Sequence, residues 1–176
     1  MMTAAARQMA KPCRGCGIVH EGVFDLAADH PIFWTHGRLS NSGQAELQVD
    51  GNILRKDWSR IHGRYFLRAF LSLPIIDSGT SLRFSIWSSI SNVDFASYVD
   101  DGLPDGAIWR SWLSSSIPSY PVDGGVAGEL FRDATGPAFR VTDTRHPLYR
   151  DQQTGIDMLR VRDLYRMTGH DVEFLQ

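Results

Sequence analysis

The chain of 176 residues has the length and composition of a globular protein, with 43% hydrophobic and 22% charged residues. Its formal net charge is −2, so the chain has no excess of basic residues to attract a nucleic acid. We therefore expect no nucleic-acid partner. No run approaches the ~20 apolar residues of a membrane helix, and the start lacks a secretory signal. We therefore expect a cytoplasmic protein with no membrane partner.

The length also predicts a single domain. Residues 1–11 are small or polar and follow no periodic pattern, which predicts a disordered tail. Residues 12–176 would form one α+β domain that begins with a turn containing a Cys-x-x-Cys pair.

That turn, "PCRGCGIVHEG", holds the clearest candidate site. Thiols stay reduced in the cytoplasm, which favours metal binding by Cys13 and Cys16 over a disulfide. The spacing lets both thiolates face one centre, and His20 would add a nitrogen ligand, so the turn indicates a zinc site. A fourth ligand would come from farther along the chain, and the candidates are His30, His36, His62, His146 or an acidic residue.

Two other interpretations of the turn stay open. A redox pair needs a cysteine at the start of a helix, and "RGCG" does not obviously begin one. The thiols can also pack as small apolar groups inside a tight turn. No cofactor is firmly implied, and zinc is the metal that the spacing favours.

The middle of the chain predicts an antiparallel hairpin. Residues Leu39–Asn52 are polar and at best weakly helical. Residues Arg64–Pro74 are rich in aromatic side chains, and Ser81–Ile90 alternate with the period of two that is typical of a strand with one buried face. The intervening "IIDSGT" supplies Asp, Ser and Gly for the turn.

Shorter elements follow the hairpin. Asn92 would cap a short helix whose apolar face holds Phe95, Tyr98 and Val99. Residues Gly128–Asp143 predict two short strands around "ATGP".

The strongest predicted helix spans Thr154 to His170. Thr154 would cap it, Asp157 would be the acid of a capping box, and Gly169 would end it. Strands in the middle and one helix at the end predict an α+β fold, with a mainly antiparallel sheet and the C-terminal helix packed on it.

A polar loop before this helix is a second candidate site. Arg145, His146 and Gln152 bring hydrogen-bonding groups together in a short stretch. One interpretation is a pocket for an anion or a carbonyl group near the helix start. The alternative is a loop whose histidine binds its own backbone.

Two strand residues are further candidates for a ligand or partner site. Arg68 has apolar neighbours, and a buried arginine needs either a ligand or a structural ion pair. Trp87 lies on the polar face of its strand, so it should be covered by a helix or exposed to a partner.

Several stretches occur together in an order that resembles a bacterial family of uncharacterised proteins, the domain of unknown function 2199. They are "CRGCGIVHEG", "RYFLRAFLSLPI", "FSIWSSIS", "LSSSIPSYP" and "HPLYRDQQTGI". The most specific parts are Cys13-x-x-Cys16-Gly17-x-x-His20 and His146-Pro147-Leu148 followed by Gln152 and Gly155.

The resemblance implies a compact single domain and no activity. Members of that family often carry a further cysteine before the strand that corresponds to Tyr65–Leu73. Here the region reads "RKDWSRIHGRYF" and contains no sulfur. If that cysteine completes a site in other members, this chain lacks one ligand.

The sequence contains no Gly-x-Ser-x-Gly, His-Glu-x-x-His or phosphate-loop motif. Together with the five tryptophans, this favours a non-enzymatic interaction or regulatory module with a protein partner. The alternative is a small enzyme with a polar site around His146 and Gln152.

Overall fold

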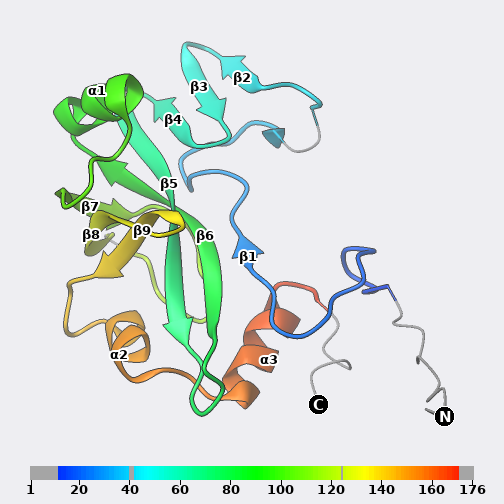
Figure 1. Cartoon of the computed structure of the whole chain (residues 1–176). Helices are drawn as coiled ribbons and strands as arrows, with labels where there is room; N and C mark the ends of the chain where they lie inside the picture. Colours follow the sequence, from blue (N-terminus) through cyan, green and yellow to red (C-terminus); the bar gives the residue numbers. More distant parts are fainter. Residues whose placement is uncertain (1–11, 40–41, 124, 171–176) are drawn as a thin grey trace, which may run out of the picture.

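The computed structural model describes residues 12–39, 42–123 and 125–170 (Figure 1). The tail predicted at residues 1–11 lies outside this part. The strands are β1 (Leu26–Ala27), β2 (Glu46–Val49), β3 (Asn52–Arg55), β4 (Trp58–Ile61), β5 (Arg64–Pro74), β6 (Ser81–Ile90), β7 (Ile108–Leu113), β8 (Val126–Asp133) and β9 (Gly136–Val141). The helices are α1 (Asn92–Asp101), α2 (Pro147–Thr154) and α3 (Met158–Met167).

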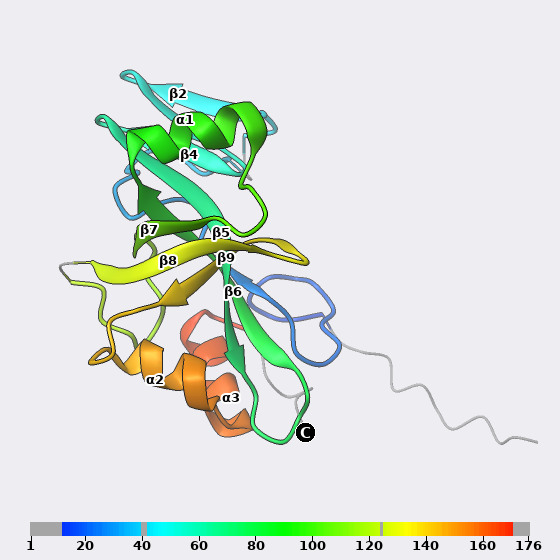
Figure 2. The same ribbon diagram turned by 60° about the vertical axis from the view of Figure 1, so that its left-hand side comes forward.

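Five strands form a closed, barrel-like arrangement. The order β6-β7-β8-β9-β5 closes on itself because β5 also pairs with β6. From β5 the sheet continues into β4, β3 and β2, and from β6 into β1 (Figure 2). The predicted β5–β6 hairpin is antiparallel and runs in register from Tyr65–Ile90 to Pro74–Ser81. The sheet as a whole is mixed, because β1 runs parallel to β6 and β9 runs parallel to β5.

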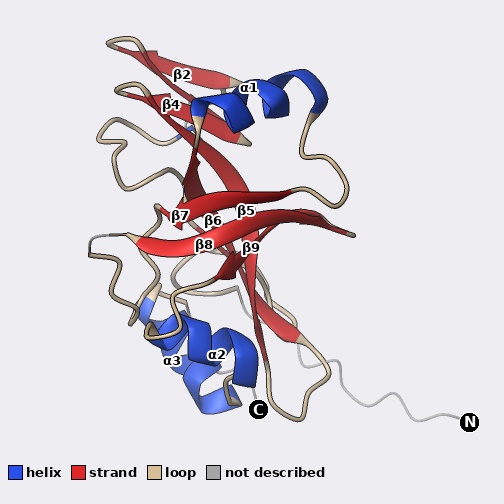
Figure 3. Ribbon diagram, turned by 90° about the vertical axis from the view of Figure 1, so that its left-hand side faces the viewer, coloured by secondary structure: helices blue, strands red, loops and turns tan. Residues whose placement is uncertain are grey.

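The main core fills the barrel and extends under the last two helices. The apolar face predicted for β6 contributes Leu82, Phe84 and Ile86 to it. The C-terminal helix packs on the sheet as expected, since Val161 and Leu164 of α3 are fully buried in the same core. Figure 3 shows α2 and α3 together at one end of the sheet and α1 at the other.

A smaller core lies between the β2–β4 extension and the segment after β1. It consists of Trp34, Leu54, Ile61, Phe66 and Trp87, all buried. This cluster buries the outer face of β6, so both faces of that strand are covered at its centre. The alternation along β6 therefore does not separate a buried face from an exposed one.

The weak helix expected within Leu39–Asn52 is replaced by strand β2, which pairs with β3. The two strands are joined by Asp50 and Gly51, whose φ angles are 49° and 78°. Two-residue hairpins with positive φ at both positions favour Asp-Gly, because glycine adopts this conformation without strain. A second such pair, His62 and Gly63, joins β4 to β5.

The helix predicted from Thr154 to His170 forms over a shorter span, as α3, and the stretch before it that was predicted as a loop contains helix α2. Pairing with the end of β5 keeps residues before Asp157 out of the helix, since Ile156 N donates to Pro74 O at 2.8 Å. Thr154 ends α2, and the cap of α3 is Asp157, which accepts from the backbone of Arg160.

Helix α1 forms where it was predicted, but its cap is Ser91 and not Asn92. The Ser91 side chain accepts from Asp94 N at 3.0 Å, which satisfies a backbone N–H that the first helical turn leaves unpaired. Within the described ranges, no helix is long and apolar enough to cross a membrane.

Candidate metal centre

The Cys-x-x-Cys segment forms a tight turn. Cys13 N donates to Ile18 O at 2.8 Å, and Gly17 N donates to Cys13 O at 2.7 Å. Gly17 has a φ of 74°, a left-handed conformation that suits glycine. The turn buries Cys13, leaves Cys16 exposed and contains no disulfide.

Four side chains converge at this turn. The ligand atoms of this cluster all lie within 4.8 Å of one another, and the residues are Cys13, Cys16, His20 and His170. Cys16 Sγ lies 3.0 Å from His20 Nε2, and Cys13 Sγ lies 3.8 Å from His170 Nδ1. On one tetrahedral zinc ion a thiolate and an imidazole nitrogen are about 3.5 Å apart. The two measured separations bracket this value, so the cluster could hold a metal ion.

The end of helix α3 positions His170. Gly169 has a φ of 80° and its N–H donates to Arg166 O at 3.0 Å, while His170 N donates to Tyr165 O at 2.9 Å. These two bonds form a Schellman motif, which fixes the backbone directly after a helix. His170 is the second residue beyond the helix cap, and the motif turns it towards Cys13.

The turn sits directly against this helix end. A Cβ atom on Gly15 would overlap the carbonyl oxygen of Gly169, so a glycine is required for this approach. The contact joins segments that are far apart in the sequence, and it keeps Cys13 beside His170.

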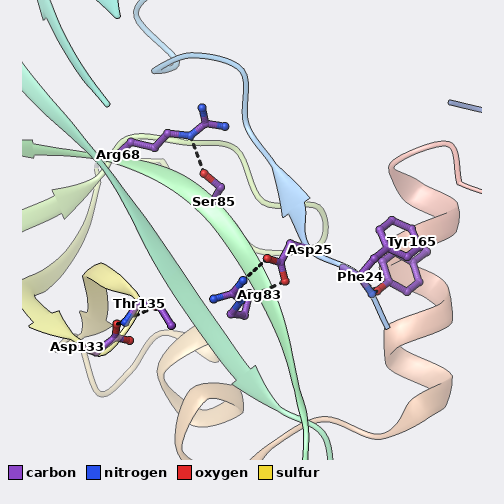
Figure 4. A network of polar contacts seen from close by, with 8 residues as sticks. All are labelled: Phe24, Asp25, Arg68, Arg83, Ser85, Asp133, Thr135 and Tyr165. Atoms are coloured by element: carbon purple, nitrogen blue, oxygen red, sulfur yellow. Dashed lines mark hydrogen bonds and ion pairs between the residues drawn. The ribbon is translucent and has the colours of Figure 1, made fainter. Parts of the chain in front are cut away.

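An aromatic stack holds His20 in place. The rings of His20 and Phe24 stack at 3.6 Å, and those of Phe24 and Tyr165 stack at 4.2 Å (Figure 4). The Tyr165 hydroxyl donates to Phe24 O at 2.6 Å and accepts from Phe24 N at 2.8 Å. Burial raises the pKa of this hydroxyl to about 12. Next to the stack, Asp25 pairs with Arg83 of β6.

Replacing Tyr165 with phenylalanine is expected to lower the free energy of unfolding by about 1–3 kcal/mol, because both backbone groups of Phe24 lose their partner in a partly buried place. Urea denaturation would measure the change. Tyr149→Phe on α2, away from the cluster, is the matched control. Equal losses in the two variants would contradict the role given to the Tyr165 hydroxyl.

The polar loop predicted as a second site binds backbone groups. His146 is the cap of α2, and its Nδ1 accepts from Leu148 N at 3.1 Å. Gln152 bridges strand β9, accepting from Val141 N at 2.9 Å and donating to Phe139 O at 3.0 Å. These contacts correspond to the alternative in which the loop residues stabilise their own backbone.

The remaining predicted ligands lie away from the four-residue cluster. Figures 1 and 2 place helix α2 and the cysteine turn on opposite sides of the molecule, and His146 is the cap of α2. Arg145 is exposed and pairs with Asp143 at 3.5 Å. Strand β4, in the stretch where the resemblance implied a further cysteine, lies at the far end of the molecule from the turn (Figure 1). His30, His36 and His62 are likewise outside the cluster.

Arg68 and Trp87 contact each other, with the guanidinium group 5.8 Å from the ring centre. Arg68 Nε donates to Ser85 Oγ at 2.6 Å (Figure 4), and burial lowers the pKa of Arg68. Trp87 is fully buried, and its indole N–H donates to Ala28 O at 3.1 Å. Trp87 is therefore covered by the segment after β1, and the expectation of a covering helix or an exposed ring was wrong.

His170 is the cluster residue that the sequence patterns did not predict. Its only signal in the sequence is its position directly after Gly169, the predicted end of a helix. Nothing in that pattern relates it to a turn more than 150 residues earlier.

No curated protein and no solved structure matches the chain. The model of a family described as "Uncharacterized protein conserved in bacteria (DUF2199)" matches residues 12–156. The matched range contains three of the cluster residues, Cys13, Cys16 and His20, and ends before His170. The match covers most of the chain and confirms the resemblance seen in its motifs. The chain therefore belongs to this bacterial family of uncharacterised proteins.

Proposed function

We propose that the protein is a non-enzymatic module that binds a protein partner, and that a structural zinc ion holds its N-terminal turn. The observation that carries the binding role is a groove of about 940 Å³ beside the β5–β6 hairpin. Phe33 and Trp112 line it and are 41% and 44% exposed. Exposed aromatic side chains in a concave surface are typical of places where protein partners bind.

The walls of this groove are held in place by contacts within the protein. Ile32 N donates to Ser114 O at 2.9 Å, which fastens the loop after β1 to the segment after β7. The Phe33 ring packs 5.7 Å from Phe66 of the smaller core. A surface held in this way loses little conformational freedom on binding, which favours affinity.

The charges of the groove indicate the chemistry of the partner. The Arg64 guanidinium lies 5.1 Å from the Phe33 ring centre, and the ion pairs among the described residues do not include Arg64. Asp123 provides an acceptor elsewhere on the lining. We expect an extended protein segment that places an apolar side chain between Phe33 and Trp112 and a carboxylate on Arg64.

The zinc ion is inferred from the donor set. The turn alone supplies two thiolates and one imidazole, which are donors that zinc prefers. The contacts of His146 and Gln152 with backbone groups also favour the binding module over an enzyme built around them.

Peptides selected from a random library on the purified protein are expected to bind Trp112→Ala at least about 10-fold more weakly than wild type, because a central tryptophan dominates such interfaces. Fluorescence polarisation with labelled peptides would measure the affinities. Leu159→Ala, an exposed leucine on α3, is the matched control and should bind normally. Failure to select any peptide, or equal binding by Trp112→Ala, would refute the groove as the binding surface.

A further inference from the structure

We propose that His170 is the fourth ligand of the zinc ion, so that one ion joins the N-terminal turn to the end of helix α3. The proposal rests on the zinc turn proposed above, and it adds the ligand and the role of the ion. The coordinating atoms would be Cys13 Sγ, Cys16 Sγ, His20 Nε2 and His170 Nδ1.

Two geometric observations support His170 as the fourth ligand. His170 belongs to the only His, Cys and acidic cluster with metal-binding spacing among the described residues. Its backbone is fixed by the Schellman motif at Tyr165 to His170, and its ring meets that of His20 edge-on at 5.4 Å. The ring is therefore positioned by the helix end before any metal binds, as a ligand of a structural site needs to be.

The site also requires both segments to be in place. Cys13 is buried at 5% exposure, and Gly15 touches Gly169, so the turn is seated on the helix end. Cys13 and His170 are 157 positions apart. An unfolded chain could offer the cysteine pair and His20 from one short segment, but it could not offer His170 at the same time. Four-ligand binding is therefore coupled to folding of the whole chain.

It follows that the ion fastens the two ends of the described chain to each other. Without it, the turn would keep its other contacts, among them the close approach of Gly15 to Gly169 and the stack on Phe24, but would lose the four bonds to the metal. We expect chelation to release the turn and the end of α3 together, and to leave the β5–β6 hairpin protected.

The test compares zinc affinity in full-length wild type, His170→Ala, His170→Cys and His36→Ala. We expect one zinc ion per wild-type chain and at least about 100-fold weaker binding by His170→Ala, because water would replace a protein ligand. His36→Ala removes another histidine and should bind as wild type. His170→Cys should restore binding, and in cobalt-loaded protein its thiolate charge-transfer absorption should grow by about half, because three thiolates replace two.

Hydrogen exchange with and without chelator gives the second measurement. Protection should fall together in residues 13–20 and 164–170. Wild-type protein without zinc would refute the zinc turn itself. One zinc ion per wild-type chain with unchanged affinity in His170→Ala would leave the zinc turn standing and overturn only the role of His170. Loss of protection at the N-terminal turn alone would overturn the fastening of the two ends.

Discussion

Removing the metal is expected to lower the free energy of unfolding by about 3–5 kcal/mol. A link between Cys13 and His170 closes a loop of nearly the whole described chain. Chain-entropy models give about 5 kcal/mol for a covalent link that closes a loop of this length, and we take a somewhat smaller value for coordination bonds. Denaturant unfolding of zinc-loaded and chelated protein would measure the difference.

Two further measurements would show that the bound metal causes this difference in stability. The melting temperature of wild type should rise with the concentration of zinc, because the ion binds the folded state more tightly. Cys13→Ser should be as unstable as chelated wild type, and chelator should destabilise it no further. Equal stability of loaded and chelated wild type would show that the ion contributes nothing to folding.

Gly15→Ala is expected to separate the cysteine turn from helix α3. The new Cβ would overlap the Gly169 carbonyl, which is a backbone atom fixed by the helix end and cannot move aside. The turn would shift, Cys13 would leave His170, and zinc affinity should fall at least about 10-fold. We also expect a loss of about 1–3 kcal/mol in stability from the overpacking. Zinc competition titration and urea denaturation would measure the two effects.

Gly37→Ala is the matched control, because Gly37 has no heavy atom within 4 Å of the added Cβ. It should bind zinc as wild type and keep its stability to within about 0.5 kcal/mol. If Gly15→Ala behaved like this control, the close approach of the turn to the helix end would not be needed for the site.

The local elements were predictable where one residue pattern determined them. The alternation in Ser81–Ile90 and the turn in "IIDSGT" predicted the β5–β6 hairpin with its bounds. The β2–β3 hairpin was missed although Asp50–Gly51 is a strong turn signal, because the flanking strands are only four residues long. The start of the final helix was predicted too early, at Thr154, because the pairing of Ile156 with Ile75 leaves no trace in the periodicity of the sequence.

The candidate site likewise combines residues that a local pattern predicts with one that only a distant contact brings in. The sequence by itself determined the cysteine pair and His20, since ligands within one turn are set by local spacing. It also indicated the family, through the order of its motifs. Only the tertiary structure brought in His170, by docking Val161, Leu164 and Tyr165 of α3 into the main core. Contacts between distant segments depend on how buried faces pack together, and no local pattern records that packing.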